Sequence, residues 1–408
     1  MRFEFWTEPG MSFLKAHFED TDSRVGKREE GMGTEITLVH DTVKFDYEVK
    51  SIHPDVLGLL CMVTFFPFIG DEAEFPQPVS PRLHKAFQNK CFTDKKNIRF
   101  RNIDSSIPMY SGDVIALSFG GGVDSSAVRQ MFPEAFVVHE AHIKDGIVLP
   151  SHCHDVVKSL ESHGRVVQSN IRYLSRPGGW HSWPCSTSTS LLMATDMNFG
   201  LILTGSILGA CYLSNGTQFW DRNAATAWHG PTGNYWQSAF DAIGLPMFSP
   251  VTGVSEFQTM QLSMKLLNAG EVVYCMESDG SPCGTCSKCF RRDVIRTYLN
   301  ETYVANWHLY QTESIIKFLQ KRPMMMGHIF STAFSLKPEL YPDWVLNETK
   351  NLTQINNDWL MRVYIPSFEL CDPEWRELIT ARVLEHINPM SQEDCSSLKE
   401  WNQNQIKN

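Results

Sequence analysis

Four cysteines in the second half of the sequence have the spacing of a metal site. Cys275, Cys283, Cys286 and Cys289 follow the pattern C-x7-C-x2-C-x2-C in a stretch that also contains glycine and proline. Four thiolates so close in sequence can close a tetrahedral zinc site, which holds together a loop too small to have its own core. An iron–sulfur cluster is the chemical alternative. We expect structural zinc, because four cysteine ligands leave no open position for catalysis.

A glycine-rich turn is the second group of residues with chemical potential. Residues 118–126, Ser-Phe-Gly-Gly-Gly-Val-Asp-Ser-Ser, follow a short apolar run. This pattern predicts a buried strand, a tight turn and the first turn of a helix, whose unpaired N–H groups attract anions, most often phosphate. A capped turn that binds nothing is the other interpretation. A Walker loop is excluded, because no Lys-Ser/Thr pair follows the glycines.

The elements around this turn alternate between strand and helix patterns. Buried strands are expected at 114–118, 135–139, 165–169 and 201–206, with helices between them at 123–131, 152–163 and 187–198. This order predicts a parallel sheet with helices on both faces, whose ligands bind at the carboxyl ends of the strands. Thr204 and Gly205 then lie at the same edge as the glycine turn. We therefore expect one nucleotide cleft.

The regions on either side of this core carry no chemical signature. Residues 1–110 are expected to form an α+β accessory region, with strands at 34–39 and 43–49 and a helix at 55–66. Residues 111–295 form the expected catalytic domain, within which 211–250 is an aromatic, non-periodic segment typical of a functional loop. Residues 296–408 are expected to be mostly helical, with helices at 313–320, 324–336, 343–353 and 373–386.

The roles of the histidines and tryptophans between residues 139 and 185 have more than one interpretation. Exposed or capping histidines are favoured over a metal site for His139, His142, His152, His154 and His163, because their spacing suits no known ligand set. The loop with Trp180 and Trp183 is compatible both with stacking on a heterocycle and with ordinary packing.

Composition restricts the class of protein. The chain has 408 residues, a net charge of −10, 42% hydrophobic residues and 20% charged residues, as an ordinary globular protein does. The acidic balance disfavours tRNA and other nucleic acids as partners. The N-terminus has no signal-peptide pattern, and the most apolar run, 56–69, is too short to span a bilayer. Because eleven cysteines occur without an export signal, we expect reduced thiols, a cytoplasmic location and no membrane partner.

The two motifs together resemble a known enzyme family. Residues 121–125, Gly-Gly-Val-Asp-Ser, match the S-G-G-x-D-S loop of the PP-loop ATP pyrophosphatases, with Gly120 where that family has its first serine and Ser118 two residues earlier. The four cysteines follow roughly 150 residues later, and Arg292 stands at the position after them where 7-cyano-7-deazaguanine synthases have arginine. Residues 113–295 are therefore similar to this synthase family.

The resemblance implies a PP-loop (adenine nucleotide alpha hydrolase-like) fold, ATP, Mg²⁺ and Zn²⁺ as cofactors, and an AMP- and pyrophosphate-forming ligase. Such enzymes adenylate the carboxylate of a 7-deazaguanine acid, which then reacts with an amine. Asp124 and Ser125 are implied as catalytic residues, and the four cysteines as zinc ligands. The implied nucleotide-binding residues are Ser118, Gly120, Gly121, Gly122, Val123, Asp124, Ser125, Ser126, Thr204 and Gly205.

The sequence also departs from this family, which leaves the product open. Residues 184–187, Pro-Cys-Ser-Thr, stand where the family has Pro-x-Arg-Asn, and no deazaguanine-recognising segment is evident in 211–250. The long flanking regions are more similar to synthase-like proteins of anti-phage defence systems, some of which join a deazaguanine to a protein amine. The acceptor is thus ammonia or a protein of a defence system. The alternatives are a PP-loop enzyme with another substrate and a non-catalytic nucleotide-binding subunit of a defence complex, as a monomer or a homo-oligomer.

Overall fold

The computed structural model describes residues 1–28, 33–93, 96–221, 235–272, 275, 283–349 and 357–403. The chain forms two compact units, each with its own hydrophobic core. The first, here called the sheet unit, consists of Met1–Gly120, Glu134–Thr204 and the described part of Trp228–Phe248. The second, the helical unit, consists of the described parts of Gly121–Pro133, Gly205–Ala227 and Ser249–Asn408.

The sheet unit is built on a nine-stranded sheet with the order β1-β2-β5-β11-β9-β8-β13-β14, in which β10 also pairs with β9. The five strands from β11 to β14 are parallel, which confirms the expected mainly parallel α/β core. The central strand β13 is buried along its whole length, as expected of a strand covered on both faces. The strands are β1 (Arg2–Glu8), β2 (Met11–His17), β5 (Thr42–Phe45), β8 (Val114–Ser118), β9 (Phe136–Lys144), β10 (Ile147–Val148), β11 (Gly164–Ser169), β13 (Phe199–Leu203) and β14 (Met247–Phe248).

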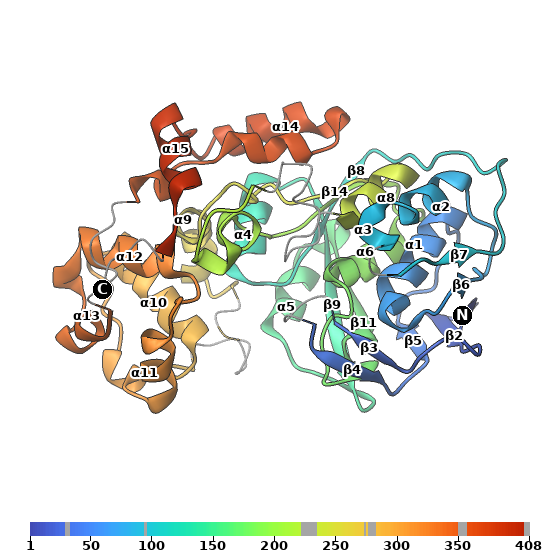
Figure 1. The fold of residues 1–408 in the computed structure, drawn as a ribbon, viewed down its shortest axis with the longest axis horizontal. Helices are drawn as coiled ribbons and strands as arrows, with labels where there is room; N and C mark the ends of the chain where they lie inside the picture. Colours follow the sequence, from blue (N-terminus) through green and yellow to red (C-terminus); the bar gives the residue numbers. More distant parts are fainter. Residues whose placement is uncertain are drawn as a thin grey trace. The chain divides into compact units, whose positions relative to one another are not determined.

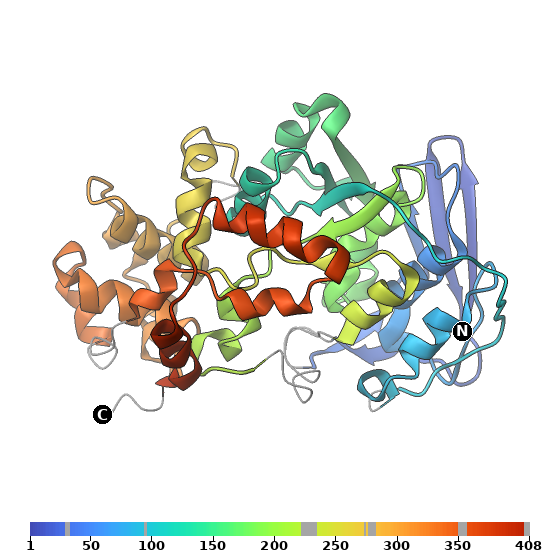
Figure 2. The same ribbon diagram turned by 90° about the horizontal axis from the view of Figure 1, so that it is seen from above.

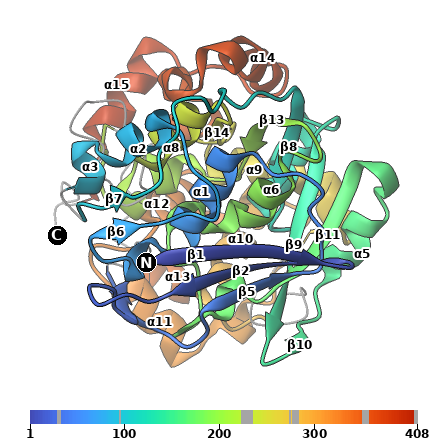
Figure 3. The same ribbon diagram turned by 90° about the vertical axis from the view of Figure 1, so that its right-hand side faces the viewer.

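Strands of the N-terminal region extend this same sheet. β1 and β2 form a long antiparallel hairpin, drawn in blue in Figure 2, and Figure 3 shows β5 beside it. β5 also pairs with β11 at Phe45 and Ser169. The expected N-terminal accessory region therefore contributes to the central sheet.

Smaller elements complete the sheets of this unit. The strands predicted at 34–39 and 43–49 are both present, but they belong to different sheets, because β4 pairs with β3 and β12 while β5 pairs with β2 and β11. The minor strands are β3 (Val25–Lys27), β4 (Glu35–Leu38), β6 (Glu72–Ala73), β7 (Arg99–Phe100) and β12 (Ser175–Arg176).

The helices of the sheet unit surround an aromatic core. The helix α1 is buried over almost all of its length, which explains why its sequence is apolar on every side. Trp236 of α8 is fully buried, with its ring centroid 5.1 Å from that of Phe92 and 5.4 Å from that of Phe66. The helices are α1 (Pro54–Phe65), α2 (Pro81–Phe87), α3 (Lys90–Thr93), α5 (His152–Lys158), α6 (Ser188–Met193) and α8 (Tyr235–Ile243).

The aromatic segment 211–250 is more regular than expected. Residues 222–234 lie outside the described part of the chain, but residues 235–248 contain α8 and β14 rather than a functional loop. The reason is packing, since Trp236 and Phe240 are both fully buried in the core of the sheet unit.

The helical unit confirms the expected helical C-terminal region. Figure 1 shows α10 beside α9 and α12, and these pairs are in contact, as are α4 and α9. The predicted helix at 313–320 is present with those bounds, and the one at 324–336 begins later, because Met326 has a left-handed backbone with φ of 59°. The helices are α4 (Val123–Met131), α7 (Leu208–Cys211), α9 (Glu256–Asn268), α10 (Ser287–Leu299), α11 (Glu313–Gln320), α12 (Gly327–Leu336), α13 (Asp343–Thr349), α14 (Pro373–Leu384) and α15 (Gln392–Glu400).

Within the described ranges, every helix is too short or too polar to cross a membrane.

The packing of Trp236 gives a test of the sheet unit. We expect Trp236→Ala to lower the free energy of unfolding by about 3–5 kcal/mol, because it empties a fully buried site between three phenylalanine rings. Urea unfolding followed by circular dichroism measures this loss. Met109→Ala, at a side chain that is 57% exposed, is the control and should change stability by less than about 0.5 kcal/mol. Equal effects of the two substitutions would contradict this account of the core.

Candidate functional site

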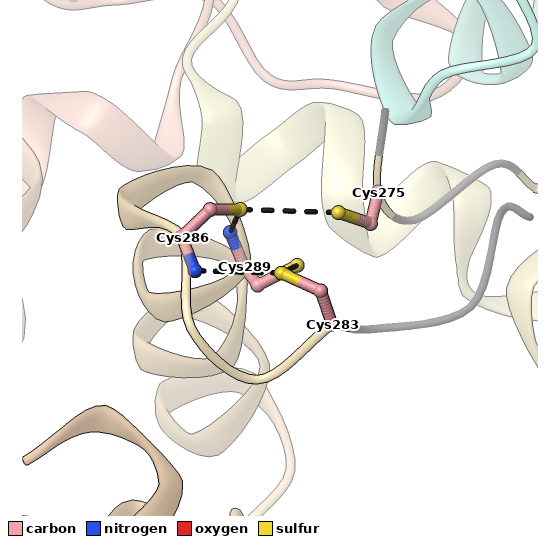
Figure 4. Close-up of side chains that lie close together, drawn as sticks. All are labelled: Cys275, Cys283, Cys286 and Cys289. Atoms are coloured by element: carbon pink, nitrogen blue, oxygen red, sulfur yellow. Dashed lines mark hydrogen bonds between the residues drawn. The ribbon is translucent and has the colours of Figure 1, made fainter. Parts of the chain in front are cut away.

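The four predicted metal ligands come together in the helical unit (Figure 4). Their sulfur atoms all lie within 4.8 Å of one another, with 3.9 Å between Cys275 and Cys286 and 3.7 Å between Cys283 and Cys289. Zinc–thiolate bonds of about 2.3 Å in a tetrahedron place sulfur atoms about 3.8 Å apart. The cluster therefore has the dimensions of a Cys₄ zinc site. Among the residues described, it is the only such group of cysteine, histidine and carboxylate ligands.

The local backbone explains how three of these ligands converge. Gly284 has a left-handed φ of 69°, which lets the chain turn sharply after Cys283. Cys286 is the N-cap of α10, and its sulfur accepts a hydrogen bond of 3.3 Å from the N–H of Cys289. Cys283 accepts a hydrogen bond of 3.4 Å from the N–H of Cys286. Such N–H donors stabilise the thiolate form of the cysteines, which is the form that binds a metal cation.

The pKa values of the cluster show why a cation matters there. Burial alone would raise the pKa of Cys283, but hydrogen bonds from Thr285 and Cys286 lower it to about 6. Burial raises the pKa of both Cys286 and Cys289. A bound cation favours the thiolate at every position and so offsets this cost of burial.

The predicted anion site, also in the helical unit, centres on the N-terminus of α4. Gly121 has a left-handed φ of 72°, and Gly122 is the N-cap of the helix, so no side chain caps its first turn. A Cβ on Gly205 would stand 2.8 Å from the backbone nitrogen of Ser125, closer than real contacts allow. Only glycine at position 205 permits this approach. The structure thus brings Gly205 and the residues Gly121 to Ser126 together.

Cations of α10 flank this helix terminus. The guanidinium of Arg292 lies 3.5 Å from where a Cβ on Gly122 would stand, and Arg292 is 5% exposed. The charges of Arg292 and Arg291 both act on Asp124, and Asp124 in turn acts on Lys288. The helix dipole and these cations therefore favour a negatively charged ligand at the same place.

Arg292 was expected from its position after the cysteines, whereas Lys288 and Arg291 were not predicted to belong to the site. Their signal was present, because the positions 288, 291 and 292 have the i, i+3, i+4 spacing that brings side chains to one face of a helix.

Helix α9 holds the first turn of α4 in place. Thr259 Oγ1 donates a hydrogen bond of 2.8 Å to Asp124 Oδ1, and Ser263 Oγ lies 2.6 Å from the carbonyl oxygen of Val123. Removal from water raises the pKa of Asp124, and the charge of Glu256 on α9 raises it further. The charges of Arg292 and Arg291 lower it. The pKa of Asp124 is thus raised by a carboxylate on α9 and lowered by two arginines on α10.

Glu256 is itself part of a buried pair. Its Oε2 lies 3.3 Å from Nε2 of His328 on α12, and both side chains are almost fully buried. Burial alone would raise the pKa of Glu256, but the hydrogen bond and charge of His328 lower it. Helix α12 therefore helps to keep a negative charge near Asp124.

Three of the predicted nucleotide-binding residues belong to the sheet unit. Ser118 Oγ is 2.7 Å from Oγ of Ser190 on α6. Gly120 accepts a weak hydrogen bond from the Cys153 thiol at 3.9 Å, and Thr204 follows the end of β13. The catalytic and nucleotide-binding roles of all these residues remain predictions.

One expectation about the histidines is wrong. His139 is 6% exposed, and its Nδ1 lies 2.7 Å from the carbonyl oxygen of Phe119, directly before the glycine turn. Burial lowers its pKa to about 4. His139 therefore supports the turn from within the sheet unit instead of facing solvent.

The metal site gives a direct test. We expect the purified protein to contain about one zinc per chain, and Cys286→Ser to lose most of it, because three thiolates bind zinc more weakly than four. Elemental analysis by mass spectrometry measures the metal. Cys395→Ser, at a partly buried cysteine outside the cluster, should retain the zinc. Iron in place of zinc, or equal metal content in both variants, would contradict the assignment.

Comparison with known proteins gives one family-level finding. A family model described as "Family of unknown function (DUF6395)" matches residues 235–402, which include the four cysteines and α10. No curated protein and no solved structure was found to match the chain.

Proposed function

We propose that this protein is an ATP-dependent carbon–nitrogen ligase similar to 7-cyano-7-deazaguanine synthase. It adenylates the carboxylate of a 7-deazaguanine acid, releases pyrophosphate, and joins the acyl group to an amine with release of AMP. The amine is ammonia or a protein amine. The observation that carries this proposal is the anion site of the helical unit, where Gly205 and the cations of α10 meet the first turn of α4.

The site suits a polyphosphate better than a single small anion. Free N–H groups of a helix terminus bind one phosphate, and Arg291, Arg292 and Lys288 add three cations. In the adenylation step, a carboxylate oxygen bonds to the α-phosphorus of ATP and the bond to pyrophosphate breaks. The charge that develops on the leaving pyrophosphate is what nearby cations stabilise.

Mg²⁺ fits this arrangement as an additional cofactor. Its preferred ligands are carboxylate and phosphate oxygens, and Asp124, with Glu256 nearby, is the carboxylate that would hold it. When bound, the ion neutralises phosphate charge. A cation also favours the ionised form of Asp124, whose pKa is otherwise raised.

The Cys₄ cluster has a positioning role in this proposal. Cys286 starts α10, and the cations of that helix follow within its first two turns. A metal that fixes the start of α10 therefore fixes the cations that face Asp124. Zinc supplies structure and takes no part in the reaction.

The second candidate function is nucleotide binding without catalysis, as a subunit of a defence complex. Gly120 favours it, because the PP-loop family has a serine donor there. An enzyme of the same loop family with another acid substrate is the remaining alternative.

The activity test uses ATP and 7-carboxy-7-deazaguanine. We expect AMP and pyrophosphate to appear with ammonium chloride present, and Asp124→Asn to slow their release by about 100-fold or more, because a neutral amide holds a cation poorly. Chromatography of nucleotides measures the products. Asp145→Asn, at an exposed loop position, is the matched control and should retain the activity. Release of ADP alone, or no turnover with ATP still bound, would contradict the proposed ligase.

The anion site is tested separately by affinity. We expect Arg292→Ala to weaken ATP binding by about 10- to 100-fold, because a charge-assisted hydrogen bond to phosphate contributes about 1.5–3 kcal/mol. Isothermal titration calorimetry measures the affinity. Arg382→Ala on α14 is the control with the same change in net charge. Unchanged affinity for ATP in Arg292→Ala would remove the main support for the proposal.

A further inference from the structure

The helical unit contains a buried pair, Glu256 and His328, to which the proposed function assigns no role of its own. Glu256 is the first residue of α9, and His328 is the second residue of α12. A Cβ on Gly209 would stand 2.9 Å from Cε1 of His328 and 3.2 Å from Oε1 of Glu256. A Cβ on Gly216 would collide with Nδ1 of His328. Two glycines of the same unit therefore make room for this pair.

Glu256 lies on the side of α9 that faces α4. Residues 256, 259 and 263 are spaced by three and then four positions, which brings their side chains to one side of the helix. Two of them contact the first turn of α4, Thr259 at Asp124 and Ser263 at the carbonyl oxygen of Val123. The third, Glu256, raises the pKa of Asp124 more than any other neighbouring charge, after the effect of burial. The two carboxylates are therefore neighbours within the helical unit.

Hydrogen bonds hold each carboxylate through one oxygen. Thr259 donates to Oδ1 of Asp124 at 2.8 Å, and Nε2 of His328 lies 3.3 Å from Oε2 of Glu256. The other oxygen of Glu256, Oε1, is buried without a hydrogen-bond donor in the described part of the chain, and the residue is 5% exposed. A buried carboxylate oxygen without a donor is costly, and a bound cation offsets that cost.

The ligand class follows from the donor atoms. Burial alone would raise the pKa of Glu256, but the hydrogen bond and charge of His328, and the charge of Arg291, lower it. Glu256 is thus ionised at neutral pH, as a cation ligand must be. Two carboxylates provide oxygen ligands only, which suit Mg²⁺ and Mn²⁺ better than softer metals. Mg²⁺ in particular is bound in many proteins by one or two carboxylates together with phosphate oxygens.

We propose that Asp124 and Glu256 together bind one divalent cation, Mg²⁺, before ATP binds, and that His328 is a positioning residue for Glu256. This inference deepens the proposed function, which assigned the ion to Asp124 alone, and the use of the ion by ATP rests on that function. Both carboxylates are already held by hydrogen bonds within the protein, so they are oriented without a nucleotide. The ion then offsets their negative charge before the phosphates arrive.

The experiment measures cation binding to the full-length, zinc-loaded protein without nucleotide. Mn²⁺ is the probe, because its free ion gives an electron paramagnetic resonance signal that disappears on binding. We expect the wild-type protein to bind about one Mn²⁺ per chain, and Mg²⁺ to displace it. Glu256→Gln should weaken the binding of Mn²⁺ by about tenfold or more, because a neutral amide replaces a charged ligand. Asp124→Asn should have an effect of similar size.

The role of His328 is tested by two substitutions. His328→Leu removes the hydrogen bond to Glu256 and should weaken Mn²⁺ binding by about tenfold, the usual effect of losing a residue that orients a metal ligand. His328→Gln keeps a donor and should restore part of the affinity. Glu313→Gln on α11, where the side chain is 82% exposed, removes the same charge as Glu256→Gln and should bind Mn²⁺ as the wild type does. Zinc content, measured on each sample, shows whether the helical unit is folded.

The results separate this inference from the ligase function. AMP and pyrophosphate release with 7-carboxy-7-deazaguanine is measured on the same samples. A wild-type protein that forms AMP but binds no Mn²⁺ without ATP overturns the preformed cation site and leaves the ligase intact. Equal Mn²⁺ affinity in Glu256→Gln, Glu313→Gln and the wild type overturns the role of Glu256. Mn²⁺ binding that depends on Glu256, without any AMP formation, supports the cation site and contradicts the ligase. If Glu256→Gln loses its zinc, Asp124→Asn and the wild type decide the outcome.

Discussion

The close contact between Gly205 and the first turn of α4 is the constraint on which the candidate anion site depends. Any side chain at position 205 would meet the backbone of Ser125 at 2.8 Å. Because this position carries no side chain, the helix terminus keeps its N–H groups close to a second stretch of backbone, and α9 fixes the other side through Thr259. Glycine at 205 thus matters as much to the site as the glycines of the turn itself.

The charge of Asp124 depends on groups that other helices of the same unit hold near it. Asp124 lies between the acidic Glu256, held by His328, and the basic face of α10. The cluster of cysteines starts α10, so a metal ion there has an indirect effect on charge at α4. The helical unit therefore holds three features of the candidate anion site: a helix N-terminus without a side-chain cap, cations on α10, and the carboxylate of Asp124, whose charge depends on both.

Features that depend on residues close together in sequence were predictable, and contacts between residues far apart in sequence were not. The turn, the parallel strands and the cysteine cluster follow from short patterns, because periodicity and ligand spacing act over a few residues. The pairing of β5 with β11 joins residues more than a hundred positions apart, and no local pattern fixes such a register. Trp236 was predicted to lie in a loop, although Trp236, Ala239, Phe240 and Ile243 have the i, i+3, i+4, i+7 spacing of a buried helix face, a signal that the sequence contains and the prediction missed.

The chain passes between the two units several times, at Gly120–Gly121, Pro133–Glu134, Thr204–Gly205 and Phe248–Ser249. Helix α4 is therefore an insertion into the sequence of the sheet unit, and no single cut yields a whole unit. A fragment beginning at residue 249 lacks α4, and a fragment ending at 248 carries α4 without its partner α9. The contribution of each unit must be assigned by point substitution in the intact chain, because truncation removes parts of both.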